Sequence, residues 1–89
     1  MKYLQEAQRV LDIEAKSILE VKSKLTLDFE KIVEIIKNCQ GKIILTGIGK
    51  SGHIARKLAS TFSSTGTPAF FLHLAESSHG DLGVISPQD

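Results

Sequence analysis

The residue types best suited to chemistry gather first in a glycine-rich stretch, G-I-G-K-S-G at residues 47–52. Where such a loop joins a strand to a helix, its backbone N–H groups and the helix dipole can face an anion. Gly49 would allow the backbone to approach a ligand closely. Lys50 would bring a cation to a phosphorylated or enolising substrate, and Ser51 a hydroxyl group. Gly49, Lys50 and Ser51 are therefore candidates for ligand contact.

A second group of ionisable residues follows an apolar run that ends at Leu72, and comprises His73, Glu76, His79 and Asp81. Histidine titrates near neutral pH, which suits it to proton transfer or to holding a sugar hydroxyl. A histidine in a loop can also be structural, and Asp81 could simply cap a turn. His73 and His79 could both ligate a metal, but a catalytic zinc site needs about three protein ligands. The segment predicts a site whose chemistry the pattern alone leaves open.

The glycine loop has three further interpretations that must be weighed. A tight strand-to-helix turn with no ligand fits the spacing. A nucleoside triphosphate loop does not, because Ile44 stands where that motif requires its first glycine. The spacing formally matches the dinucleotide fingerprint, but His73 and Leu74 stand where its acidic residue is expected. The dinucleotide interpretation is weak on this pattern, and the pattern alone does not exclude it.

The periodicity of apolar residues predicts the elements that position both segments. Apolar side chains at helical spacing indicate two amphipathic helices, and short apolar runs indicate buried parallel strands on either side of a third helix. The expected ranges are helices at 3–24 and about 29–38, a strand at 42–46, a helix ending near 64 and a strand at 69–72.

This order predicts an α/β fold in which a helical segment, residues 1–41, precedes the first β-α-β unit of an open parallel sheet, residues 42–89. Both chemical segments would then lie at the carboxyl edge of the sheet, where such folds bind ligands. A two-stranded parallel sheet leaves the flanking helices with uncovered apolar faces. We therefore expect an incomplete domain that is a fragment or needs a partner.

Composition narrows the functional classes. Eleven basic and ten acidic residues give a net charge of +1, which offers no electrostatic reason to expect nucleic acid or an anionic membrane as partner. Cys39 is the single cysteine, so no internal disulfide can form. No apolar run approaches the roughly 20 residues of a membrane helix. These features predict a cytoplasmic protein.

Two motifs together carry a family resemblance: G-I-G-K-S-G-H-I-A-R-K-L-A-S-T-F-S-S-T-G-T-P-A-F-F-L-H at residues 47–73 and E-S-S-H-G-D-L-G at residues 76–83. They closely resemble the SIS domain of arabinose 5-phosphate isomerases, a flavodoxin-like three-layer fold. The resemblance is dense from residue 42 to residue 89 and weaker over the N-terminal helices. It favours a sugar-phosphate site over the alternatives above.

The resemblance implies isomerisation of D-ribulose 5-phosphate to D-arabinose 5-phosphate through a cis-enediol, supplying Kdo for lipopolysaccharide. It places catalytic importance on Lys50 and substrate contacts on Gly66, Thr67, His73 and His79. His73 also matches a position able to bind zinc, although the chemistry implies no required cofactor. We add that His79 could open the sugar ring. Glu76 matches no known base position, so no residue is nominated as the base.

Several features of the family are absent from this sequence. Leu74 stands where the family commonly has proline. The serine-rich phosphate loop, the catalytic glutamates, a histidine from a neighbouring subunit and the CBS domains do not occur in it. The resemblance therefore predicts an isomerase fragment inactive alone and, with the full domain, a homo-oligomer. A sugar-phosphate-binding SIS module without catalysis, or a remnant without function, remains an alternative.

Overall fold

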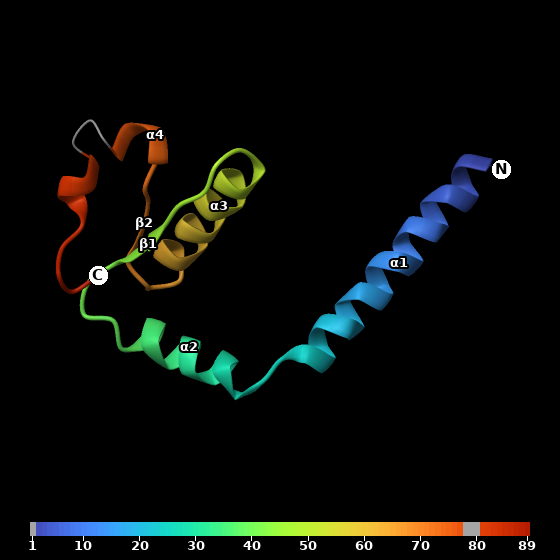
Figure 1. Ribbon diagram of the computed structural model, residues 1–89, viewed down its shortest axis with the longest axis horizontal. Coiled ribbons are helices and arrows are strands. Elements are labelled where there is room, and N and C mark those ends of the chain that lie inside the picture. Colours follow the sequence, from blue (N-terminus) through green and yellow to red (C-terminus); the bar gives the residue numbers. More distant parts are fainter. Residues whose placement is uncertain (1, 78–80) are drawn as a thin grey trace. The chain divides into compact units, whose positions relative to one another are not determined.

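The computed structural model describes residues 2–77 and 81–89, so the candidate His79 lies outside the described residues. The described elements are helices, two short strands and a final 3-10 turn (Figure 1). They divide into two compact units, one extending to Ile32 and the other from Val33 to Asp89.

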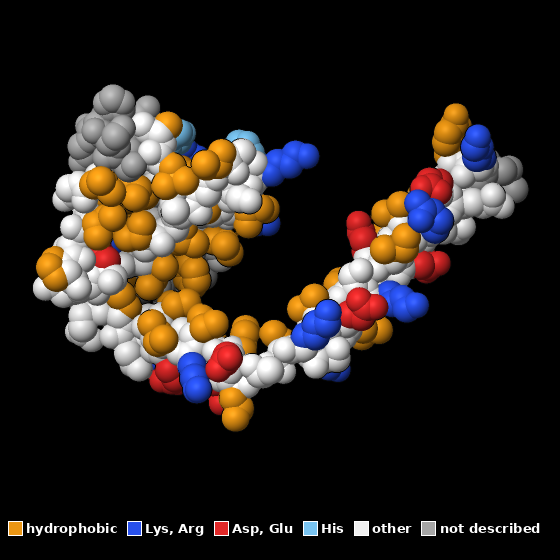
Figure 2. Space-filling model, in the orientation of Figure 1, with side chains coloured by type: hydrophobic (Ala, Val, Ile, Leu, Met, Phe, Trp, Pro, Cys, Tyr) orange, Lys and Arg blue, Asp and Glu red, His pale blue; other side chains and the backbone are white. Residues whose placement is uncertain are grey.

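The first unit contains helix α1 (Lys2–Lys24) and the start of helix α2 (Leu27–Lys37). Thr26 caps α2, because its side-chain oxygen accepts a hydrogen bond from the backbone N–H of Asp28 at 3.3 Å. Neither helix has a buried residue among those described, and large apolar side chains of both are exposed (Figure 2). Packing within the unit therefore covers neither apolar face.

The second unit is built on strands β1 (Ile43–Leu45) and β2 (Ala69–Phe71), which are joined through helix α3 (Lys50–Ser64). The strands are parallel, with Ile43 opposite Ala69 and Leu45 opposite Phe71. Helix α3 packs on both strands and buries Ala55 and Ala59. Beyond β2, the backbone N–H of Leu72 donates to the carbonyl of Leu45 at 2.8 Å. The small helix residues allow the helix to approach the sheet closely.

The last segment folds back onto the start of β1 (Figure 1). After the short helix α4 (Leu74–Ser77) and the 3-10 turn η1 (Asp81–Val84), the chain reaches Asp89, whose side chain is only 4% exposed. The Asp89 carboxylate accepts hydrogen bonds from the backbone N–H of Lys42 at 3.0 Å and of Ser86 at 2.8 Å. It also pairs with the Lys42 ammonium at 3.0 Å. This ion pair fixes the final turn.

The Asp89 contacts predict a pH-dependent stability. Hydrogen bonds from the Lys42 backbone, the Ser86 backbone and the Lys42 ammonium hold the pKa of Asp89 well below its usual range. Since the ionised form is favoured in the fold, this stabilisation is present above about pH 4 and is lost as the pH falls further. We expect Asp89→Asn to lower the midpoint of urea unfolding at pH 7, with a gap to wild type that narrows below pH 4. An Asp12→Asn control should show no such gap, and a gap independent of pH would contradict the assignment.

The predicted α/β fold is confirmed, with the two helices, the strand–loop–helix–strand order and the parallel pairing all as expected. Both strands are shorter than predicted, because only three residues of each form the ladder. Helix α4 and the turn η1 have no counterpart in the prediction. Among the described residues, no helix combines the length and apolarity needed to cross a membrane.

Candidate functional site

The glycine loop is shaped by a close approach between the end of β1 and the start of α3. A Cβ atom added to Gly52 would lie 2.7 Å from the backbone oxygen of Gly47, and one added to Gly47 would lie 2.8 Å from the backbone carbon of Ser51. Neither distance leaves room for a methyl group. These two glycines therefore have a packing role, which is the role that the last glycine of a strand-to-helix loop has in nucleotide-binding folds.

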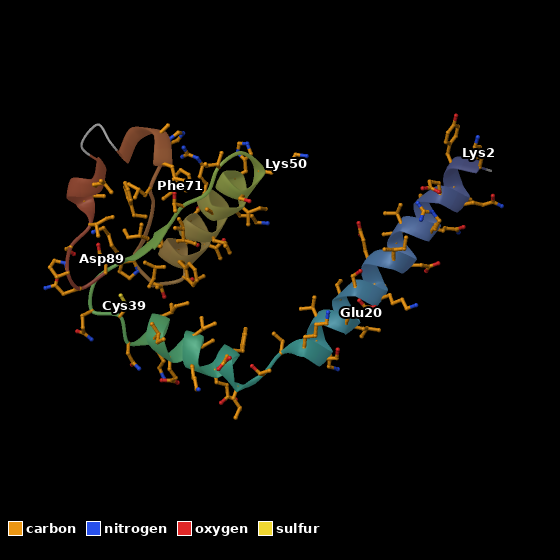
Figure 3. The ribbon with its side chains drawn as sticks, in the orientation of Figure 1. Lys2, Glu20, Cys39, Lys50, Phe71 and Asp89 are labelled. Carbon is orange, nitrogen blue, oxygen red and sulfur yellow. The ribbon has the colours of Figure 1, made fainter. Side chains whose placement is uncertain are left out.

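Gly49 has a different role, because it forms the turn immediately before helix α3 with a positive φ. Its φ of 60° with ψ of −128° is a conformation that side chains disfavour, and no atom of the described chain lies within 4 Å of the position where a Cβ would stand. It is also the N-cap of α3, so Ser51 is not the N-cap but a residue of the first helical turn. Lys50 and Ser51 form the first turn of α3 and both are exposed. Figure 3 labels Lys50 at the start of this helix.

His73 follows β2 at the same edge of the sheet as the glycine loop. It lines a cavity of about 190 Å³ together with Gly47, Gly49 and other residues. A second cavity of about 500 Å³ shares Gly47, Gly49 and His73 with the first and adds Ile48, Leu74 and Ala75. The two predicted segments therefore meet at the carboxyl ends of the strands. Lys50 and Ser51 are not among the described lining residues of either cavity, although both follow Gly49, which lines both.

The smaller cavity includes three residues that the sequence prediction missed: His53, Arg56 and Phe71. The Arg56 guanidinium carbon lies 4.2 Å from the centre of the Phe71 ring, a distance at which cation–π attraction is effective. The ring of His73 meets the Phe71 ring nearly edge-on, with 6.2 Å between the centroids and 85° between the planes. The spacing of three residues between His53 and Arg56 could have predicted that they share a helix face. It could not have predicted that this face borders the site.

Gly66 and Thr67 lie at the opposite end of β2. Gly66 has a φ of 101°, and the backbone N–H of Thr67 donates to the carbonyl of Phe62 at 2.8 Å, which closes the turn after α3. Because they precede β2 whereas His73 follows it, the described chain does not bring them to the cavity of His73. Their role in substrate contact stays a prediction.

The zinc prediction for His73 also stays a prediction. Among residues 2–75 and 82–89, whose side chains are described, no group of three or more His, Cys, Asp or Glu side chains is placed to hold a metal ion. The described residues alone therefore do not supply a zinc coordination set. His79, the other predicted ligand, falls in the part of the chain that is not described, and the side chain of Glu76 is not described either.

Comparison with known proteins shows which family this chain belongs to. The model of the SIS domain matches residues 35–89, which include β1, the glycine loop, α3 and β2. The chain belongs to the SIS domain family. The cavity that joins the glycine loop to His73 therefore lies in the SIS part of the chain.

Individual relatives agree with this assignment. Arabinose 5-phosphate isomerase KdsD of Yersinia pestis is 49% identical over 87 residues, which is 98% of this chain and 26% of that protein. The solved structure of an Escherichia coli CFT073 protein in complex with arabinose 5-phosphate is 42% identical, with a TM-score of 0.89 over 99% of this chain and 47% of that one. A putative phosphosugar isomerase of Bacteroides fragilis NCTC 9343 is 40% identical, with a TM-score of 0.88 over 97% and 46%. The chain spans about a quarter of the length of the curated relatives it matches.

Proposed function

We propose that this chain is part of a sugar-phosphate isomerase that interconverts D-ribulose 5-phosphate and D-arabinose 5-phosphate. The observation that carries the proposal is the 49% identity to an arabinose 5-phosphate isomerase over nearly the whole chain. The cavity between the glycine loop and His73 supports it, because it offers a concave site at the sheet edge where open α/β folds bind ligands. The proposed substrate class rests on the relatives, and the proposed roles in substrate binding and charge stabilisation rest on the residues of this chain.

In this proposal, the residues of the chain bind the sugar and stabilise charge. Transfer of a proton between adjacent carbons through a cis-enediol develops negative charge on a sugar oxygen, which a nearby cation stabilises. Lys50 takes this role, since it immediately follows Gly49 of the cavity wall. His73 would hold a sugar hydroxyl, and its position in the wall of both cavities supports this role. His79 keeps its proposed part in ring opening, and we assign the general base to no residue.

We further propose a cytoplasmic homo-oligomer whose product enters lipopolysaccharide synthesis. The exposed apolar side chains of α1 and α2 support the oligomer, because surfaces of this kind favour burial against another protein surface. The small net charge of +1 supports the absence of a nucleic-acid partner. The reaction itself needs no redox cofactor, since isomerisation moves a proton between neighbouring carbons.

The experiment is an isomerase assay on the protein as the cell produces it, with whatever sequence accompanies this chain there, because the chain alone is expected to be inactive. We expect D-ribulose 5-phosphate to be converted to D-arabinose 5-phosphate, measured by chromatography of the two sugar phosphates, with deuterium from heavy water appearing at the carbon next to the carbonyl. A protein that binds D-arabinose 5-phosphate but converts neither sugar would support the non-catalytic binding module instead. A protein that neither binds nor converts them would overturn the proposal.

A further inference from the structure

His73 comes just after strand β2, and hydrogen bonds from the end of β1 hold the chain immediately before it. The preceding residue, Leu72, is 5% exposed. Its backbone N–H donates to the carbonyl of Leu45 at 2.8 Å, and its own carbonyl accepts a hydrogen bond from the Thr46 hydroxyl at 2.5 Å. Both backbone polar groups of Leu72 are therefore tied to the end of β1.

The hydrogen bond from Thr46 depends on the side chain at position 46. Thr46 and Leu72 each follow the last paired residue of their strand, and the hydroxyl of one reaches the carbonyl of the other. The Leu72 carbonyl and the His73 nitrogen belong to one planar peptide unit, so holding the carbonyl orients the start of His73. A serine at position 46 could make the same hydrogen bond, whereas a valine of similar shape could not.

The imidazole of His73 has a separate support in the Phe71 ring. The two residues are two positions apart in an extended segment, so their side chains leave the chain on the same side. Their ring centroids are 6.2 Å apart with the planes at 85°, which is an arrangement that aromatic pairs prefer. Phe71 is half-buried and its ring is itself held, because the Arg56 guanidinium carbon lies 4.2 Å from its centre. An exposed histidine would otherwise sample several rotamers, so this contact limits the orientations of His73.

We infer that Thr46 and Phe71 are positioning residues for His73. The hydroxyl of Thr46 fixes its backbone, and the Phe71 ring, which Arg56 supports, fixes its imidazole beside the two cavities. The inference rests on the proposed function, in which His73 holds a sugar hydroxyl. A side chain that is already ordered loses less conformational entropy when the ligand binds. Because His73 would hold the hydroxyl in the ground state and in the transition state alike, loss of its positioning should raise KM and change kcat much less.

The first measurement is the steady-state conversion of D-ribulose 5-phosphate by variants of the protein as the cell produces it, with whatever sequence accompanies this chain there. Thr46→Val removes the hydroxyl at nearly constant volume, and Phe71→Leu removes the aromatic ring but keeps an apolar side chain. Each should raise KM about two- to tenfold, the usual effect of one lost hydrogen bond or aromatic pair. Thr46→Ser, which keeps the hydroxyl, should stay close to the wild-type KM.

Two control variants remove equivalent contacts away from His73. The Ser63 hydroxyl donates to the Ala69 carbonyl at 3.1 Å, at the opposite end of β2, so Ser63→Ala removes a matching hydrogen bond to the same strand. Phe70 is the neighbour of Phe71 in β2 and faces the other side of the sheet, so Phe70→Leu is the matched aromatic loss. Both controls should keep the wild-type KM, and their melting temperatures, followed by circular dichroism, show what destabilisation alone does.

The second measurement reports on His73 without any substrate. In protein labelled with carbon-13 in its histidine rings, the imidazole signal of His73 is identified by its loss in His73→Gln. At a fixed pH, Thr46→Val and Phe71→Leu should each move this signal toward the chemical shift of histidine in an unfolded peptide. Ser63→Ala and Phe70→Leu should leave it where the wild type has it.

The outcomes separate this inference from the proposed function, and each variant decides for its own residue. If Thr46→Val or Phe71→Leu leaves either the His73 signal or KM as in the wild type, the inference is wrong for that residue even where isomerase activity is found. Equal changes in the control variants would reveal a general loosening of β2 and would also overturn it. If the His73 signal moves as expected but the wild type converts neither sugar, the positioning of His73 stands and the proposed function fails.

Discussion

Replacing Lys50 with methionine is expected to lower kcat for isomerisation by roughly 10²–10³-fold, the usual cost of removing one group that stabilises an oxyanion. The measurement is the steady-state rate of conversion of D-ribulose 5-phosphate by wild type and Lys50→Met. KM should change much less, because the charge that Lys50 meets develops only during proton transfer. Lys50→Arg, which retains a cation at this position, should recover part of the rate.

The position of Lys50 makes this test independent of folding. Lys50 is exposed and opens α3, where the positive end of the helix dipole disfavours a cation by some tenths of a kcal/mol up to about 1 kcal/mol. Its removal should therefore leave the melting temperature unchanged or slightly raised. Lys57→Met is the matched control and should keep wild-type kcat. A Lys50→Met enzyme that retains wild-type kcat would remove Lys50 from the mechanism and leave the residues of the smaller cavity as the candidates.

The direction of the strands is the only feature of the sequence that predicts which residues of the site lie together. Residues that follow parallel strands must meet at one edge of the sheet, so the glycine loop and His73 could be placed together from sequence. The same rule separates Gly66 and Thr67 from His73, since they precede β2. The separation of Gly66 and Thr67 from His73 could therefore have been predicted from the strand order. The family resemblance alone does not predict it, because it identifies substrate-contacting positions without saying at which end of a strand they lie.

Other features depend on packing that no local pattern encodes. Arg56 belongs to the site because of the way α3 lies against the sheet, which brings its guanidinium over Phe71. From sequence, an arginine between apolar helix positions resembles any solvated charge. The pairing of Lys42 with Asp89 is equally hidden, because the two residues are 47 positions apart and neither belongs to a motif. Long-range contacts of this kind require the fold to be known.

Replacing Gly52 with alanine is expected to destabilise the fold more than Lys50→Met does. The added Cβ would stand 2.7 Å from the Gly47 oxygen and 3.3 Å from its carbon, so the backbone of β1 or α3 must move. Alanine would otherwise favour the helix by about 1 kcal/mol. Overpacking costs about 1–3 kcal/mol even where flexible side chains can adjust, and a backbone carbonyl adjusts less. We expect the melting temperature to fall by roughly 5–20 °C.

Gly83→Ala is the control that isolates this steric effect, because no atom of the described residues lies within 4 Å of the position that its Cβ would occupy. Its stability should stay within about 0.5 kcal/mol of wild type. Thermal unfolding followed by circular dichroism compares the three proteins. Equal stability of Gly52→Ala and Gly83→Ala would mean that α3 does not approach β1 as closely as described. Since Gly47 and Gly52 hold the loop that forms both cavities, a folded Gly52→Ala protein should also lose ligand affinity, which links the packing of the loop to its proposed function.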